Sequence, residues 1–331
     1  MLLRITHETE LRYDELISES AMELRMAPRQ EIDQHRLSFQ LAIGPAASVA
    51  SYFDWLGNTV HTFAVNPFHR EIRIIANSVV ETDRPVPNIW GIADQWPIAR
   101  GSLDYAMWDY LQFGGPIVDC PQLRDLAQSL RPRDGASLGK LCLHIMQLVD
   151  SRFTYEKGVT TAASPITEIL DHGRGVCQDF THLMIGLGRA LGIPSRYVSG
   201  FVHRDGETTR GYSQTHAWCE MLFPSIGWIG FDPTNNCLIG NNFVEVAIGR
   251  DFRDVPPNRG VYRGTSDENI NVAVDIEELA AIPPALVAER FHSIDLEVYA
   301  QRRHADAQAV AQQQEQQQQE LRQQQEQQQQ Q

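Results

Sequence analysis

The chain has 331 residues, of which 42% are hydrophobic, so it is long enough for two globular domains with substantial cores. Its formal net charge of −14 argues against nucleic acid or an anionic membrane as the main partner, because no basic face offsets the acidic groups. The first residues lack a basic segment followed by an apolar one, and no later run is long enough to span a bilayer. We therefore expect a cytoplasmic protein.

Residues 1–85 have the pattern of β structure. The segments 38–43 and 59–65 alternate apolar and polar residues, and the turn-forming segment 54–58 lies between them. Several short strands separated by turns predict a small antiparallel β-sandwich with no catalytic pattern of its own. The Pro85-Val-Pro87 sequence then marks a boundary.

Helices are expected next. Residues 86–135 are predicted to form a helical connector, in which Ser102 caps one helix and Pro121 begins another. The core is predicted over 136–300, and its first helix follows Ser137. A short helix opened by Ser164-Pro165 ends at Leu170.

A Gly-rich turn, Gly173-Arg-Gly175, delivers Cys177 to the first turn of an amphipathic helix that stops at Gly192. Apolar residues recur from Cys177 at helical spacing, so this side chain lies on the same side as the buried stripe. The positive end of the helix dipole and the unpaired N–H groups of the first turn favour the thiolate of such a cysteine. Cys177 is therefore a candidate nucleophile, and a small buried hydrophobe is the alternative.

Strands dominate after this helix, over 196–202, 216–223 and 227–232, with a turn at 224–227. The segment 249–264 is expected to be a loop rich in Arg, Asp and Pro, and 269–275 a closing strand of the C-terminal extension. Residues 301–331 are mostly glutamine and are predicted to form a disordered tail. The chain is thus predicted to be an α+β protein whose nucleophile helix packs on an antiparallel sheet.

Cys177, His216 and Asp232 have the composition of a thiol nucleophile, a general base and its orienting carboxylate. A turn centred near Ser225 sets Trp218 opposite Asp232. His216 is then the diagonal neighbour of Asp232 on the same face, with Cβ atoms about 7–8 Å apart. A shift of one residue in register would place the two side chains on opposite faces.

The expected reaction is attack of the Cys177 thiolate on an amide or ester carbonyl, followed by resolution of the thioester by water or an amine. The backbone N–H of Cys177 is the natural first donor to the oxyanion. Candidates for the second donor or for substrate contact are Gln178, Tyr155 and Trp218.

Four segments resemble the bacterial transglutaminase-like superfamily: 175–184 (GVCQDFTHLM), 191–200 (LGIPSRYVSG), 215–218 (THAW) and 227–235 (GWIGFDPTN). The first 80 or so residues resemble the β-rich region that often precedes this core in bacteria, through 24–30 (LRMAPRQ) and 53–58 (FDWLGN). Residues 249–262 (GRDFRDVPPNRGVY) resemble the C-terminal portion of the same family.

This resemblance implies a papain-like fold with a catalytic triad that maps to Cys177, His216 and Asp232. All three positions hold the expected residue. Thr181 stands where small residues such as Ala are common, and Cys219 where Val is common; neither departure touches the triad.

Four functional readings remain open from the sequence. The first is a peptidase or amidase acting on a peptide or protein, the second is acyl transfer from glutamine to an amine, and the third is a non-catalytic peptide-binding module. The fourth, a metal site, has little support, since Cys177, His182, Cys219 and Cys237 lack the close paired spacing of structural zinc. No metal or other cofactor is expected.

Overall fold

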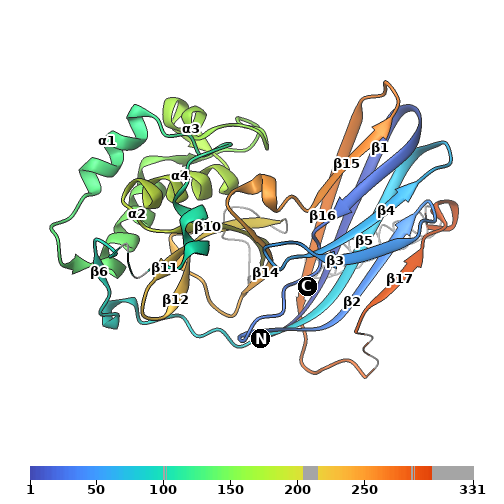
Figure 1. Cartoon of the computed structure of the whole chain (residues 1–331). Helices are drawn as coiled ribbons and strands as arrows, with labels where there is room; N and C mark the ends of the chain where they lie inside the picture. The colour runs from blue at the N-terminus through green and yellow to red at the C-terminus, as the bar shows by residue number, and fades with distance from the viewer. Residues whose placement is uncertain (100, 102, 204–214, 285, 287, 300–331) are drawn as a thin grey trace, which may run out of the picture.

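The computed structural model describes residues 1–99, 101, 103–203, 215–284, 286 and 288–299. Figure 1 shows two parts, a strongly twisted β domain and a core in which helices cover a smaller sheet. This is the α+β architecture predicted from the sequence, with a helix that begins at Cys177 packed on an antiparallel sheet.

The β domain confirms the strand pattern of the first 85 residues. Its strands from this segment are β1 (Leu2–Leu24), β2 (Gln34–Gly44), β3 (Val49–Phe53), β4 (Thr59–Val65) and β5 (His69–Thr82). The predicted turn between β3 and β4 is held by Asp54, whose Oδ1 accepts the backbone N–H groups of Leu56 and Asn58.

The long strand β1 belongs to both halves of this sheet. Residues 2–12 pair with β5, whereas residues 20–24 pair with β4. The sheet therefore folds back on itself into a nearly barrel-shaped sandwich around a buried apolar core (Figure 1).

The C-terminal segment returns to the β domain. It adds β15 (Asn258–Arg263) and β16 (Glu268–Glu278), which both pair with β1, and β17 (Arg290–Ser293), which pairs with β2. The closing strand expected at 269–275 is confirmed as part of β16. The prediction of a loop over 249–264 is wrong at its C-terminal end, where β15 forms. These residues do not alternate in polarity, and they become a strand because they pair with β1.

The connector between the two parts is less helical than predicted. It contains the 3₁₀ helices η1 (Ile89–Gly91) and η3 (Tyr105–Leu111), the strand β6 (Gln95–Trp96) and the helix α1 (Pro121–Leu130). Asp104 caps η3 through the N–H of Tyr105, while the predicted cap Ser102 lies outside the described residues. The helix predicted to begin at Pro121 is confirmed.

In the described residues, the core consists of three helices and a five-stranded sheet. The helices are α2 (Leu138–Arg152), α3 (Ile166–His172) and α4 (Cys177–Ala190), and short pairings involve β7 (Ala136–Ser137), β8 (Thr154–Tyr155) and β9 (Arg174–Gly175). The sheet has the order β13-β12-β11-β10-β14. Its strands are β10 (Ser195–Val202), β11 (His216–Phe223), β12 (Gly227–Asp232), β13 (Cys237–Leu238) and β14 (Phe243–Gly249), and η4 (Phe252–Asp254) follows.

Helix α4 is more deeply buried than an amphipathic helix would be, since every residue from Asp179 to Arg189 is buried. The sheet contacts one side, and α1, α2 and α3 cover the others (Figure 1). The buried Arg189 guanidinium donates to the carbonyls of Tyr110, Gln112 and Ser195. The helix thereby anchors the connector to the sheet.

Two side-chain amides join the β domain to the core at β14, the edge strand of the core sheet. Gln34 exchanges two hydrogen bonds with the backbone of Glu245, both 2.8 Å, and Asn58 does the same with Ile248 at 2.8 and 2.9 Å. Both amides are fully buried. They satisfy backbone groups that an edge strand would otherwise leave open.

Candidate active site

Local backbone geometry fixes the position of Cys177. Gly173, with φ of +68°, ends α3, and β9 leads directly into α4. A Cβ at Gly175 would lie 2.8 Å from the Asp179 side chain, so only glycine permits this approach. Asp179 Oδ2 accepts the Val176 N–H at 2.8 Å and the Thr160 hydroxyl at 2.6 Å. Asp179 thus fixes the chain that enters the cysteine helix.

We expect Asp179→Ala to lower the free energy of unfolding by about 1–2 kcal/mol, because it leaves a helix-start N–H and a hydroxyl without their acceptor. Urea unfolding followed by circular dichroism measures the change. Asp125→Ala, at an exposed position of α1, is the matched control and should be close to neutral. Equal stability of the two variants would contradict this role of Asp179.

The hairpin of β11 and β12 brings His216 and Asp232 together. It pairs Cys219 with Phe231, so Trp218 lies opposite Asp232, as the sequence predicts. His216 Nε2 lies 2.7 Å from Asp232 Oδ2, and both side chains are buried. The carboxylate therefore fixes the orientation of the imidazole ring.

Asp232 is held in turn by the residues that follow it. Its Oδ1 accepts the N–H groups of Thr234 and Asn235 at 2.9 and 3.2 Å, and its Oδ2 accepts from Asn235 Nδ2 at 2.5 Å. Burial would raise the pKa of Asp232, but His216 and these donors lower it below its usual range. The structure adds Asn235 to the predicted site residues. The signal for it was the Asp-Pro-Thr-Asn sequence, which favours an Asx turn.

Cys177 and His216 line one cavity of about 210 Å³. Burial lowers the pKa of His216, but Asp232 and a hydrogen bond with Cys177 outweigh it and raise the pKa to about 10. Nε2 is engaged by Asp232, so Nδ1 is the nitrogen left for the thiol. Cys177 itself is only partly buried. The arrangement can therefore hold a thiolate beside an imidazolium at the edge of a small pocket.

The other predicted site residues lie in different places. Tyr155 and Gln178 line the cavity with Cys177, since β8 pairs with β9 just before α4. Burial and the nearby Cys177 raise the pKa of Tyr155 to about 12, so its hydroxyl remains a donor. The Gln178 amide donates to the carbonyl of Ala162 at 3.0 Å. Trp218 does not line the cavity; it is fully buried, with its ring centroid 6.3 Å from that of His216.

His182, on the second turn of α4, stabilises the fold and does not line the cavity. Its Nε2 accepts the Phe252 N–H at 3.1 Å, and its ring packs against Tyr197. Burial lowers the pKa of His182 to about 3, so the ring stays neutral. It holds η4, which supplies Phe252 to the cavity wall. Among the described residues, no cluster of three metal-ligating His, Cys, Asp or Glu side chains occurs.

The described part of the chain contains no helix with the length and apolar character of a membrane span. This finding concerns helices alone.

Residues 124–233 match the transglutaminase-like superfamily, and residues 3–81 match the bacterial transglutaminase-like N-terminal region. An uncharacterized protein of Mycobacterium tuberculosis is 33% identical over 291 residues, which cover 82% of this chain and 91% of the relative. An uncharacterized protein of Mycobacterium leprae is 32% identical over 285 residues, covering 84% of this chain and 99% of the relative.

Two further similarities are to proteins whose names refer to an activity. A solved structure from Cytophaga hutchinsonii, described as a "putative cysteine protease", has a TM-score of 0.71 at 21% identity and covers 87% of this chain and 93% of its own. A protein-glutamine gamma-glutamyltransferase of Pseudomonas aeruginosa is 27% identical over 175 residues, which are 50% of this chain and 26% of that protein. From its sequence and its fold, this chain belongs to the transglutaminase-like superfamily, with the bacterial transglutaminase-like N-terminal region ahead of the core.

Proposed function

We propose that this protein is a cysteine peptidase or amidase that cleaves an amide bond of a peptide or protein through a thioester on Cys177. The observation that carries the proposal is the buried His216–Asp232 pair at 2.7 Å, with the imidazole also hydrogen-bonded to Cys177. A nucleophile, a base and an orienting acid in this arrangement are the parts that thiol-dependent acyl transfer needs. The family to which the chain belongs consists of cysteine enzymes, which supports the same class.

In the acylation step, His216 holds the proton of the Cys177 thiol, and the thiolate sulfur attacks the carbonyl carbon of the substrate. The negative charge moves to the carbonyl oxygen, where the backbone N–H of Cys177 and the Tyr155 hydroxyl are the proposed donors. The C–N bond then breaks, and the His216 imidazolium gives its proton to the leaving nitrogen. A thioester and a free amine result.

In the deacylation step, a water molecule gives a proton to His216 while its oxygen attacks the thioester carbonyl. The C–S bond breaks, the carboxylic product leaves, and Cys177 recovers its proton from the imidazolium. Because Cys177 is partly exposed, water reaches the thioester from solvent. Hydrolysis is therefore the proposed outcome.

The test is a product analysis with glutamine-containing peptides in the presence of glycinamide. Hydrolysis predicts cleaved or deamidated peptides and little glycinamide adduct, as measured by mass spectrometry. A dominant adduct would instead assign acyl transfer to an amine, the activity that gives the Pseudomonas aeruginosa relative its name. Products that persist unchanged in Cys177→Ala would reject the thioester route altogether.

A further inference from the structure

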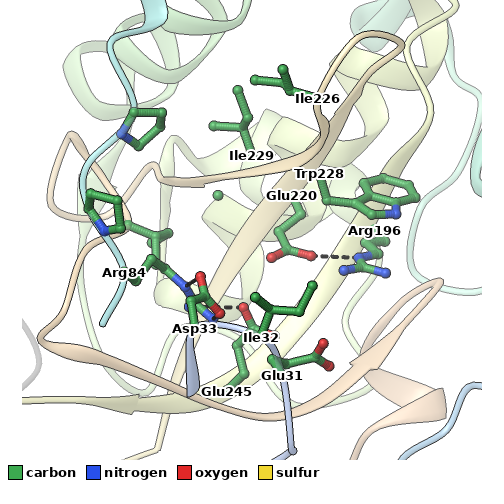
Figure 2. A pocket seen from close by; sticks show the side chains of 14 residues that line it. Glu31, Ile32, Asp33, Arg84, Arg196, Glu220, Ile226, Trp228, Ile229 and Glu245 are labelled. Carbon is green, nitrogen blue, oxygen red and sulfur yellow. Dashed lines mark hydrogen bonds and ion pairs between the residues drawn. The ribbon is translucent and has the colours of Figure 1, made fainter. Parts of the chain in front are cut away.

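A second cavity, of about 480 Å³, lies between the β domain and the core (Figure 2). It shares no lining residue with the 210 Å³ cavity at Cys177. Its walls come from the loop before β2, the linker after β5 and the strands β10, β11, β12 and β14. A volume of this size lies within the range of roughly 300–1,000 Å³ that small-molecule sites occupy.

Charged side chains face this cavity, and the carboxylates outnumber the guanidiniums. Asp33 is paired with Arg84 through both oxygens, at 2.6 and 2.9 Å. Glu220 accepts from Arg196 Nε at 2.5 Å, and Glu245 Oε1 lies 2.9 Å from Arg84 Nη1. The fourth carboxylate of the cavity belongs to Glu31, which Arg29 pairs from outside the cavity at 2.7 Å.

Two buried carboxylates, those of Glu220 and Glu245, each have one oxygen that takes no part in an ion pair within the described part of the chain. Glu220 and Glu245 are only 5% and 4% exposed, so water screens neither of them well. The ion pairs given above use Glu220 Oε2 and Glu245 Oε1, and among the described residues their other oxygens accept no hydrogen bond. Because both side chains line the cavity, a ligand that donates hydrogen bonds would be matched to these oxygens.

The remaining walls are apolar. Figure 2 shows Ile226 and Ile229 on the side of the cavity above the carboxylates, and Pro85 and Pro87 belong to the linker wall. The Trp228 ring is covered by the Arg196 guanidinium, 4.3 Å from its centroid. The cavity therefore offers acceptors to a cationic group and an apolar surface to an aliphatic chain. Both guanidiniums already have acidic partners among the described residues, which disfavours an anion.

We propose that this cavity between the domains binds a small aliphatic amine, with its ammonium groups on Glu220 and Glu245 and its hydrocarbon chain against Ile226 and Ile229. The site lies on the same strand as His216 but apart from Cys177, so the amine is an accessory ligand and not the acyl acceptor. A diamine offers one ammonium group to each carboxylate.

The protonation of Glu245 makes the proposed binding depend on pH. Burial and the negative charge of Glu220 raise the pKa of Glu245 to about 8, against the lowering effect of Arg84 and Arg196. Glu31 also raises it. Because a cation prefers the ionised carboxylate, affinity should increase by up to about 25-fold from pH 6.5 to pH 8.5, as Glu245 loses its proton.

The test is isothermal titration of the full chain at pH 8.5 with cadaverine, glutarate and 1,5-pentanediol, which have the same chain length and different charge. We expect saturable binding of cadaverine alone. Nα-acetyl-lysine methylamide is titrated beside it: binding of both assigns the ammonium of a lysine side chain, and binding of cadaverine alone assigns a free amine. Wild-type protein that does not bind cadaverine at about 10 mM overturns the proposal, as does binding of Mg²⁺ in its place.

Glu220→Gln and Glu245→Gln keep the shape of the side chain and remove its charge, so each should weaken cadaverine binding by at least about tenfold. Glu277→Gln, which alters an exposed ion pair with Arg4, is the matched control and should bind as the wild type does. Near-ultraviolet circular dichroism shows whether each variant is folded. Undiminished binding in both folded cavity variants would mean that cadaverine binds elsewhere and would overturn the site.

Discussion

Replacing Cys177 by Ala should lower kcat/KM for amide cleavage by at least about 10³-fold, while leaving the free energy of unfolding nearly unchanged. The sulfur forms the covalent bond in the proposed mechanism, so His216 has no other nucleophile to activate. Cys177 is only partly buried, and its truncation leaves a small surface hollow rather than a core cavity. Initial rates on a cleaved peptide and urea unfolding curves measure the two effects.

The control for this variant is Cys120→Ser, a buried cysteine at the start of α1 and outside the cavity. Serine is a good residue at the start of a helix, so both rate and stability should be retained. This pair of variants also separates an enzyme from a peptide-binding module on the same fold. A peptide-binding module would bind its peptide equally well after either substitution, and the wild type would show no amide cleavage. That result would contradict the proposal.

The parts of the site that could be predicted from the sequence are those set by local rules. Gly173 and Gly175 mark the turn before α4, and Gly192 marks its end, so the position of Cys177 on the first turn follows from capping signals. The turn at 224–227 fixes the register of β11 against β12, and register fixes which side chains share a face. The placement of His216 beside Asp232 therefore needed no tertiary information.

Other features depend on contacts between distant segments, and local rules do not reveal those. The strand β15 forms because β1, more than 230 residues earlier, offers it a partner. Trp218 has the right spacing to reach the site, but the sequence does not show that its ring packs beneath His216 and away from the cavity. The same holds for the second cavity, because Glu245 meets Arg84 only when the domains dock through Gln34.

Replacing Asp232 by Asn should lower kcat/KM by about 10²–10⁴-fold, because the amide no longer stabilises the imidazolium or fixes the ring tautomer. The pH dependence should change as well. Asp232 and Cys177 hold the pKa of His216 at about 10 against burial, so the wild-type imidazolium is retained until the pH rises through that value. Without the carboxylate, burial lowers this pKa, and the alkaline limb of kcat/KM should move to lower pH.

The free energy of unfolding should also depend on pH through His216. The pKa of His216 is raised above its unfolded value of 6.5, so its contribution to folding is complete below pH 6.5 and is lost as the pH rises toward 10. Asp232→Asn should therefore differ most from the wild type in unfolding free energy near pH 6 and least at the alkaline end. Asp94→Asn is the matched control, since Asp94 accepts the Ser225 hydroxyl at the other end of the same hairpin and should leave kcat/KM within about twofold. If Asp232→Asn retained the wild-type rate and an unmoved alkaline limb, the orienting group for His216 would have to be a residue other than Asp232.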